Sequence, residues 1–519
     1  MKKRFNLILF VLLILGSMVR AQTGCQNFEK YYDISYNQEN FDIDYVSSGG
    51  YIVYGGQAND TLGTVNYHSV VYRLDANGDT VWTRSMGLDD PTNFYGKFGL
   101  FPSIWFRQGA LLQDSIIIAC GTFQDSSCQE YFHCYGRVVR YTMQGDTVWT
   151  RLLALPDSSV GMYGMLVYDD STLIIAGDYR PLYGPGNPLA KQKMLVCKYS
   201  ISGNLIWRKC LPVLTQGSGY KISKAPNGDI LFCGYVIKND EYDPALARLN
   251  ASGDVQWADS TGGIYYDYYV KAIALSDNSL ITIGPRSIIA NNSKKVFNIK
   301  KFSSSGTLLW EKIMSLFRYG GLSDGFELSD GGLIFTGGIG DSTGNIMGYL
   351  LRTDSNGDSL WSRSFGDTTT HKFFHCIAQT CEGYVMAGIS FLPNNLSYIG
   401  RAKSWVIHTD TLGFVTTGIE DFKSELSLAQ MDLPYPNPAK YSTQIKLFVP
   451  DLPSNVYTQE GKSYLYIFNI LGKQLEKVEL QRGEQNLTLN VSAFPTGSYV
   501  LVMSVNGYNA CTRKLMVVK

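Results

Sequence analysis

One hairpin sequence recurs along the chain and constrains its fold more than any other feature. In its first copy, residues 70–87, an apolar, β-branched segment leads into a turn at Asn77-Gly78, and a second segment carries Trp82 four residues after the glycine. Two such runs around a glycine turn predict a β-hairpin. The pattern returns in six further segments, the last of which lacks the tryptophan: 137–153, 194–210, 245–260, 298–313, 349–364 and 405–418.

A second repeated segment precedes each hairpin. It begins with a polar turn, continues with a few apolar residues, and ends with a small residue and glycine. So short an apolar run between turn signals is typical of a strand that is buried on both faces. The seven copies occupy residues 49–56, 114–121, 170–177, 227–234, 277–284, 330–338 and 381–388.

The spacing of these units predicts a closed ring. A further apolar segment usually comes before the polar turn, so each unit contains about four strands, and successive hairpin tryptophans lie 50 to 67 residues apart. Such units are typical of propeller blades, and closing the ring removes the sheet edges that an open array would expose. We therefore predict an all-β fold, a seven-bladed β-propeller, over residues 22–418.

The two ends of the repeat region suggest how the ring closes. The seventh copy reaches Thr417 without a tryptophan strand, whereas residues 27–32 precede the first unit and have an aromatic-x-Lys pattern similar to the repeated Trp-x-Arg. We therefore predict that residues 27–32 supply the last strand of the seventh blade.

Composition agrees with this fold and excludes two classes of partner. Charged residues make up 17% of the chain, below the usual ~25%, and 52 of the 519 residues are glycine, which favours short strands and tight turns. Basic and acidic residues number 45 each, so the formal net charge is zero. This balance gives no electrostatic basis for binding nucleic acid or an anionic membrane surface.

The N-terminus has the parts of a secretory signal peptide. Lys2, Lys3 and Arg4 precede an apolar run at 5–15, and small residues lead to a predicted cleavage site between Ala21 and Gln22. The alternative is a membrane anchor, but the apolar segment is shorter than the ~20 residues that span a bilayer. We therefore expect residues 1–21 to be removed and the chain to be exported.

The repeat units resemble the tandem propeller repeats of secreted Bacteroidetes proteins. The resemblance covers residues 28 to about 418 and rests on the glycine-ended apolar segments and the Asn-Gly turns followed by tryptophan. It implies the propeller fold and indicates no particular ligand.

The pattern changes after a charged linker at residues 419–430. Alternating strands with Leu-Gly-Lys and Asn-Gly turns predict a small, immunoglobulin-like β-sandwich over residues 431–519. This region is similar to the type A C-terminal sorting domain of the type IX secretion system. The matching motifs are Tyr435-Pro-Asn-Pro438, Asn469-x-x-Gly472-Lys473, Pro495-x-Gly497-x-Tyr499 and residues 514–519. The resemblance implies the outer-membrane secretion machinery as a partner, export across that membrane, removal of the domain, and release or surface attachment.

Two motifs resemble catalytic or metal sites, but their context favours a structural interpretation. His371 and His375 have an i, i+4 spacing, which brings two ligands together only in a helix, and they lie just before a predicted strand. Gly321-Leu-Ser323-Asp-Gly325 matches the elbow of hydrolases, but we expect a loop there, without the following helix that the elbow requires.

The hairpin turns and tryptophans invite further comparisons. The turns that begin at Asp75 and Asp354 resemble calcium loops, yet the position that needs a bidentate glutamate holds Met86 or Phe365. The spacing from glycine to tryptophan also occurs in pyrroloquinoline quinone enzymes, which use a vicinal cysteine pair that this chain lacks. We therefore interpret the tryptophans as packing anchors between blades, and we predict no catalytic residue, metal or cofactor.

Ten cysteines in an exported chain permit disulfides. Two local pairings remain open, Cys128 with Cys134 across a loop and Cys376 with Cys381 across a turn. Four further cysteines lie in predicted strands and are expected to be small core residues: Cys120, Cys197, Cys210 and Cys233.

The densest aromatic cluster is a possible ligand platform. It comprises Tyr265, Tyr266, Tyr268 and Tyr269, and it follows a tryptophan strand, where it can line one face of the ring. Aromatic rings often hold sugars or peptides, although packing between blades is the alternative explanation.

These features favour a secreted or cell-surface binding or adhesion propeller for an extracellular glycan or protein. The alternative is an extracellular carbohydrate-active hydrolase or lyase with its site at the mouth of the channel, because propellers can build sites from loops that are distant in sequence. A third hypothesis is a structural surface protein that contacts only sister proteins.

Overall fold

The structure is a computed structural model that divides the chain into two compact units, Met1–Val415 and Thr416–Lys519. It describes residues 27–32, 37–58, 67–86, 105–112, 116–125, 133–155, 158–181, 192–211, 216–238, 241–260, 262, 267–287, 295–314, 320–340, 344–366, 370–392, 402–415, 429–450, 463–469, 474–505 and 508–519. The predicted cleavage site at Ala21 and Gln22 lies outside these residues. Over the described ranges, no helix is long and apolar enough to cross a membrane.

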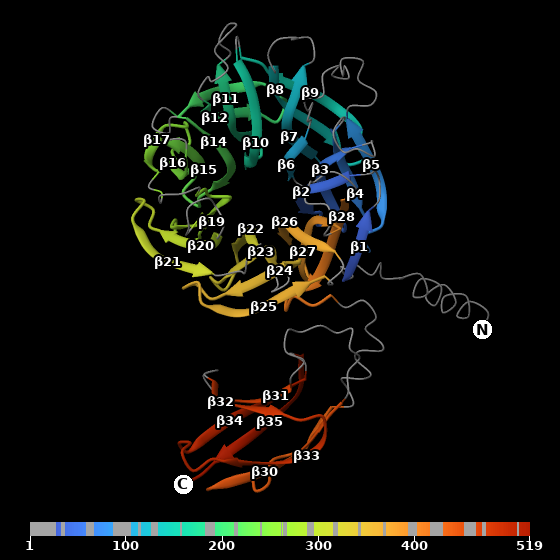
Figure 1. Cartoon of the computed structure of the whole chain (residues 1–519), viewed down its shortest axis with the longest axis vertical. Coiled ribbons are helices and arrows are strands. Elements are labelled where there is room, and N and C mark those ends of the chain that lie inside the picture. The colour runs from blue at the N-terminus through green and yellow to red at the C-terminus, as the bar shows by residue number, and fades with distance from the viewer. Residues whose placement is uncertain are drawn as a thin grey trace, which may run out of the picture. The chain divides into compact units, whose positions relative to one another are not determined.

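The first unit contains seven four-stranded antiparallel sheets arranged in a ring, as Figure 1 shows. Blades one to three comprise β2 (Asn37–Tyr45), β3 (Tyr51–Ala58), β4 (Tyr67–Leu74) and β5 (Thr80–Met86); β6 (Trp105–Leu112), β7 (Ile116–Asp125), β8 (His133–Thr142) and β9 (Thr147–Leu153); and β10 (Ser158–Asp169), β11 (Thr172–Pro181), β12 (Lys193–Ser200) and β13 (Leu205–Cys210). Blades four to six comprise β14 (Gly217–Lys224), β15 (Ile230–Lys238), β16 (Glu241–Leu249) and β17 (Val255–Asp259); β18 (Lys271–Ala274), β19 (Leu280–Ser287), β20 (Lys295–Phe302) and β21 (Leu308–Met314); and β22 (Gly321–Glu327), β23 (Leu333–Gly340), β24 (Ile346–Thr353) and β25 (Ser359–Phe365). Blade seven comprises β26 (His371–Gln379), β27 (Gly383–Phe391), β28 (Lys403–Asp410) and β1 (Phe28–Tyr32). The predicted seven-bladed propeller is therefore confirmed.

The N-terminal strand closes the ring, as the aromatic-x-Lys pattern predicted. Strand β1 pairs antiparallel with β28, from Phe28 opposite His408 to Tyr32 opposite Ser404. The hydroxyl of Tyr32 also donates to the carbonyl of Gly78 in blade one, at 2.6 Å. The strand thus completes blade seven and contacts blade one.

In six of the seven blades, a glycine in the second strand lets the inner strand approach closely. In blade six, a Cβ at Gly337 would lie 1.8 Å from the carbonyl oxygen of Gly321; in blade three, a Cβ at Gly177 would lie 1.9 Å from that of Gly161. The inner strand carries a bulge just after this contact, for example between Leu322 and Asp324. These six glycines, which end the upstream segment or stand one residue before its end, are therefore required by a backbone contact.

The repeated tryptophan holds each blade to the turn of the next. A Cβ at Gly357 would lie 2.8 Å from the indole of Trp310 in the preceding blade. The indole N–H of Trp257 donates to the carbonyl of Ser304 in the next blade, at 2.9 Å. The turn glycine therefore has two roles, since it also adopts a positive φ of 79° in the case of Gly357. The interpretation of the tryptophans as packing anchors is confirmed.

The same contact repeats around the whole ring. Each turn glycine faces an aromatic ring of the preceding blade, and the pairs are Gly78 with Phe28, Gly145 with Trp82, Gly203 with Trp149, Gly253 with Trp207, Gly306 with Trp257, Gly357 with Trp310, and Gly413 with Trp361. Phe28 of β1 therefore takes the place of the tryptophan that the seventh hairpin lacks.

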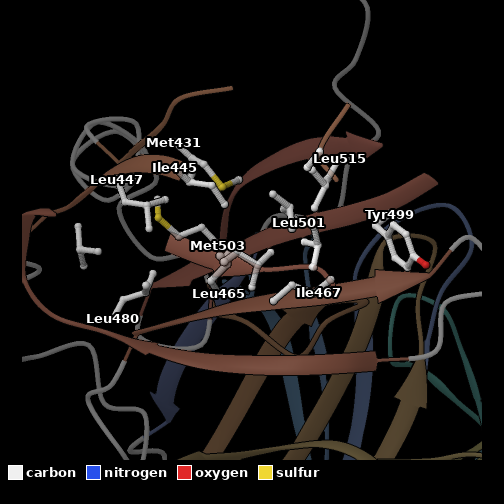
Figure 2. Close-up of a cluster of buried hydrophobic side chains, with 14 of the residues drawn as sticks. Met431, Ile445, Leu447, Leu465, Ile467, Leu480, Tyr499, Leu501, Met503 and Leu515 are labelled. Atoms are coloured by element: carbon white, nitrogen blue, oxygen red, sulfur yellow. The ribbon is translucent and has the colours of Figure 1, made fainter. Parts of the chain in front are cut away.

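The second unit is a sandwich of two sheets. One contains β29 (Gln430–Met431), β30 (Ser442–Val449) and β33 (Gly483–Asn490), and the other contains β32 (Gln474–Leu480), β31 (Ser463–Asn469), β34 (Gly497–Val505) and β35 (Tyr508–Val517). Strand β30 alternates exposed and buried side chains. Figure 2 shows the resulting apolar core, in which residues such as Ile445, Leu465 and Leu501 are fully buried.

Candidate functional site

The predicted tyrosine platform divides into residues with different surroundings. Tyr265 and Tyr266 lie outside the described residues. Tyr269 is 4% exposed and packs with Leu246 and Leu280 in the core between blades four and five; this burial raises its pKa above the usual range. Tyr268 is half-buried. The structure therefore places Tyr269 in blade packing and Tyr268 where its ring is partly accessible.

Tyr268 belongs to a cluster of four tyrosines from blades four and five. Its ring centroid lies 6.0 Å from that of Tyr220, which lies 5.5 Å from that of Tyr235, and Tyr235 lies 4.4 Å from Tyr242. Tyr220, Tyr242 and Tyr268 are half-buried, and Tyr235 is buried. We call these four residues the tyrosine cluster. Its members other than Tyr268 were missed from the sequence because each is isolated within a strand.

A buried carboxylate borders the tyrosine cluster. Asp178 follows the close-approach glycine of blade three, just as Tyr235 follows that of blade four. Its Oδ2 accepts hydrogen bonds from the hydroxyl of Ser218 and the side-chain amide of Gln192. Burial nevertheless raises the pKa of Asp178 to about 6. Burial, with nearby Tyr242 and Asp178, also raises the pKa of Tyr235 to about 12. Ser218, which hydrogen-bonds to Asp178, lies opposite Tyr235 in the ladder between β14 and β15, so the carboxylate and the tyrosine cluster are neighbours.

The site lies at the end of the propeller opposite the repeated hairpin turns. Those turns join the first strand of a blade to its second, and the third to its fourth, as in the turn closed by Leu275 and Ser279 at 2.9 Å. The tyrosine cluster and Asp178 lie near strand ends that lead to residues 182–191, 239–240 and 263–266. Aromatic rings can stack on a ligand, while an amide and a carboxyl with a pKa near neutral can form hydrogen bonds to it.

The pKa of Asp178 predicts a measurable dependence of stability on pH. Because its pKa is higher in the folded protein than the ordinary value of 3.8, the folded state binds more protons between about pH 4 and pH 6. This group therefore contributes stability at low pH that is lost as the pH rises through that window, on the order of 3 kcal/mol in all. We expect the stability of Asp178→Asn, relative to wild type, to rise by this amount between pH 4 and 7 in urea unfolding. A constant difference would contradict the assignment.

A second polar cluster lies on the inner strands and has a structural role. Asp324 forms an ion pair with Lys271 and accepts a hydrogen bond from the backbone N–H of Ile377 in the next blade, at 3.3 Å. Asp42 accepts from the N–H of Gly109 at 3.0 Å, again in the next blade. Burial raises the pKa of Asp42, and the charge of Lys221, from blade four, opposes the rise. These side chains therefore connect the inner strands of neighbouring blades.

The two motifs that resemble metal or hydrolase sites form inner strands, which corrects the expectation that they precede a strand or lie in a loop. His371 and His375 are in β26, and Nδ1 of His371 accepts from the N–H of Ile346 at 3.0 Å. Ser323 is in β22, and its hydroxyl donates to the carbonyl of Phe374 at 2.6 Å. Inner strands escape recognition because one edge faces the channel and their residues are polar or small. Among the described residues, no group of three His, Cys, Asp or Glu residues is placed to hold a metal.

The turns that resemble calcium loops use their carboxylates internally. Oδ1 of Asp75 accepts hydrogen bonds from the backbone N–H groups of Asn77 and Asp79, at 2.9 and 2.8 Å. Oδ1 of Asp354 does the same within its own turn. The interpretation of these segments as hairpin turns is confirmed.

The cysteines lie in several environments. Cys376 and Cys381 do not bond to each other: the thiol of Cys376 is buried against the carbonyl of Ala387, and Cys381 accepts a hydrogen bond from the hydroxyl of Tyr45. Cys128 lies outside the described residues, as do the side chains of Cys120 and Cys134. Of the remaining strand cysteines, Cys197 and Cys233 are buried as expected, whereas Cys210 is exposed because its side chain is on an outer strand.

Comparison with known proteins identifies the second unit. Residues 434–518 match the family model of the secretion system C-terminal sorting domain. A search of curated proteins finds no match.

Solved structures with a similar fold are distant in sequence. The WD40 domain of Neurospora crassa Pan2 is 10% identical, with 74% of this chain and 100% of that chain covered and a TM-score of 0.40. Trypanosoma rangeli sialidase, solved with sialic acid, is 10% identical, with 83% and 86% covered and a TM-score of 0.41. Puromycin hydrolase is 12% identical, with 80% and 60% covered and a TM-score of 0.41. None of these likenesses indicates a function for this chain.

The sorting domain determines where the chain goes. Such domains direct proteins across the outer membrane and interact with the type IX secretion machinery. The chain is thus a seven-bladed β-propeller joined to a member of the type IX secretion system C-terminal sorting domain family, and it is secreted to the cell surface or the extracellular space.

Proposed function

We propose that the propeller is a binding or adhesion module for an extracellular glycan or protein and that its ligand contacts the tyrosine cluster. The observation that carries this proposal is the set of half-buried rings of Tyr220, Tyr242 and Tyr268. Tyr220 contacts Tyr268, and both Tyr220 and Tyr242 contact the buried ring of Tyr235. Rings of this kind supply large contact areas at low cost in conformational entropy.

The polar groups beside the rings supply orientation. Arg180 is exposed, and its guanidinium donates to the side-chain oxygen of Gln192 at 3.2 Å, while the amide of Gln192 donates to Asp178. This chain of hydrogen bonds holds the Gln192 amide and the Arg180 guanidinium beside the aromatic surface. A site with a few oriented polar groups next to aromatic rings is the usual composition of a ligand-binding surface.

An extracellular hydrolase or lyase is the second candidate, and the near-neutral pKa of Asp178 favours it. A carboxyl with a pKa of about 6 can act as a general acid near neutral pH. Glycoside hydrolysis, however, ordinarily needs two carboxyl groups that flank the scissile bond. Asp178 would supply one of them, so this candidate requires a second carboxylate from another part of the site.

Binding and product release, measured together, distinguish the two candidates. The exported chain, from Gln22 onward, is incubated with a panel of polysaccharides and extracellular proteins, and bound ligand and soluble fragments are followed in the same samples. We expect binding without fragments, and an affinity at least tenfold weaker in the double variant Tyr220→Ala/Tyr242→Ala, because two ring contacts are lost. Leu360→Ala, an exposed apolar residue of β25, is the matched control and should bind like wild type.

The possible outcomes have distinct meanings. Fragments that disappear in Asp178→Asn would support the enzyme. Binding that is unaffected by the double variant would place the ligand elsewhere and contradict the proposed site. An absence of both binding and fragments across the panel would favour the structural surface role.

A further inference from the structure

Carboxylates border the tyrosine cluster of the propeller. Tyr242 stands between Glu241 and Asp243 in β16, and Asp267 directly precedes Tyr268. The N–H of Asp267 donates to the carbonyl of Tyr242 at 2.7 Å, so these two segments are adjacent in space. Neighbours along a chain lie within the Debye length of about 8 Å at physiological salt, so these three charges act on anything that contacts the rings.

Two cations border the same surface, and each has a carboxylate beside it. Nζ of Lys238 lies 3.3 Å from Oδ2 of Asp243, and Lys238 is opposite Glu241 in the ladder between β15 and β16. Burial raises the pKa of Asp178 and the charge of Arg180 opposes the rise, which indicates that these two charges are close together. Four carboxylates therefore accompany two cations, and negative charge is in excess beside the rings.

The lysine next to Tyr220 does not alter this balance. Burial raises the pKa of Asp42 in blade one, and the charge of Lys221 is the chief one that opposes the rise. Lys221 and Asp42 thus compensate each other between inner strands of different blades. The excess of negative charge beside the tyrosine cluster remains.

A tyrosine elsewhere in the propeller shows how such a ring holds a cation. Nζ of Lys198 and Nζ of Lys224 lie 4.2 and 4.5 Å from the ring centroid of Tyr168. Cations within about 6 Å of a ring centroid are attracted because the face of the ring carries the negative part of its quadrupole. The half-buried rings of the tyrosine cluster offer the same chemistry to a ligand.

Rings beside excess negative charge fit a ligand that carries a cation on an apolar stem. The side chains of lysine and arginine have this form, since the stem can pack on a ring while the charged head reaches a carboxylate. A neutral glycan would use the rings but not the charge, and an acidic glycan would be repelled by it. A basic protein segment therefore matches the surface better than either kind of glycan.

We propose that the propeller binds a basic segment of an extracellular protein, whose lysine or arginine side chains lie on Tyr220, Tyr242 and Tyr268 with their charged heads near Glu241 and Asp267. This inference rests on the proposed binding function and narrows its ligand to one class. Glu241 is half-buried and can contact the ligand. Asp267 is 6% exposed and acts through its field, which burial leaves weakly screened by salt.

Calorimetric titration with three probes tests the proposal. The exported chain, from Gln22 onward, is titrated at physiological salt with an arginine decapeptide, a glutamate decapeptide and a neutral dextran. We expect only the arginine decapeptide to bind, with a Kd about tenfold weaker in Glu241→Lys because a like charge then faces the ligand. Tyr242→Leu should weaken binding more than Tyr242→Phe, because only phenylalanine keeps an aromatic face.

A matched control separates local from general effects of charge. Asp146→Lys makes the same kind of charge reversal at an exposed residue of a hairpin turn, at the opposite end of the propeller, and should bind like wild type. An equal loss of affinity in Asp146→Lys and Glu241→Lys would overturn the proposal. Equal affinities of Tyr242→Leu and Tyr242→Phe would overturn the contact between cation and ring.

Failure of this inference and failure of the proposed function give different results. A chain that does not bind the arginine decapeptide overturns the basic ligand. If a glycan then binds to wild type and is lost from Tyr220→Ala/Tyr242→Ala, the tyrosine cluster still stands as the binding site. An arginine decapeptide that binds equally to wild type and to this double variant would contradict both the inference and the proposed site.

Discussion

A chain that begins at residue 33 is expected to melt about 10 °C below one that begins at Gln22. Strand β1 contributes a full ladder to β28 and buries Phe28 and Tyr32, which are 5% and 7% exposed. Burial of two aromatic side chains contributes roughly 1.5–3 kcal/mol each, and the hydrogen bond from Tyr32 to Gly78 about 1 kcal/mol more. The sum, on the order of 5 kcal/mol, corresponds to this shift at about 2 °C per kcal/mol.

Calorimetry on the two chains measures the effect. A third chain that begins at Asn27 is the control, because it keeps β1, and it should melt with the longer one. The point variant Phe28→Ala should lie between the two extremes, since it removes only the ring that packs against the turn at Gly78. Equal melting temperatures for the chains that begin at 22 and 33 would show that β1 does not close the ring.

Replacement of Gly337 by alanine is expected to destabilise the propeller by about 4 kcal/mol. The new Cβ would lie 1.8 Å from the carbonyl oxygen of Gly321, and a backbone atom of the inner strand can move only if the bulge beside it moves as well. Overpacking against a rigid neighbour ordinarily costs about 1–3 kcal/mol, and a contact this short lies beyond that range.

Two other glycines of blade six separate the cost of the backbone conformation from the cost of the steric contact. Gly331 has a φ of 79° and open space around its Cβ position, so Gly331→Ala should cost only the roughly 1–2 kcal/mol of a left-handed backbone. Gly357 combines the same φ with a contact to Trp310, so Gly357→Ala should fall between the other two. Urea unfolding of the three variants measures the order, and a Gly337→Ala variant as stable as Gly331→Ala would refute the close-approach argument.

The candidate site was predicted only in part, for a reason that particular residues illustrate. Tyr268 and Tyr269 are adjacent in sequence, yet one ring joins the tyrosine cluster and the other enters the core, because successive side chains of an extended segment point in opposite directions. Tyr220, Tyr235 and Asp178 come from three strands in two blades, and nothing in their local sequence distinguishes them from core residues. Only the radial packing of the blades brings them together.

The sequence by itself determined the repeating architecture. The turn glycines are needed for a positive φ, the tryptophans that follow them for ring packing, and the glycines at or next to the end of the upstream segments for close backbone approach. Because each requirement is local, it fixes one residue type at one spacing in the repeat. The aromatic-x-Lys segment at 27–32 and the sorting motifs were recognisable for the same reason.

Only the tertiary structure decided which surfaces are available for binding. The inner strands at His371–Gln379 and Gly321–Glu327 were missed because a strand edge that faces a channel tolerates polar and small residues. The tyrosine cluster likewise depends on which distant segments become neighbours, because its residues come from different blades. In the second unit, the hydrogen bond between Asn437 and Met516 joins two distant segments in the same way. Such proximity is set by the closure of a ring or the pairing of two strands, which no short stretch of sequence encodes.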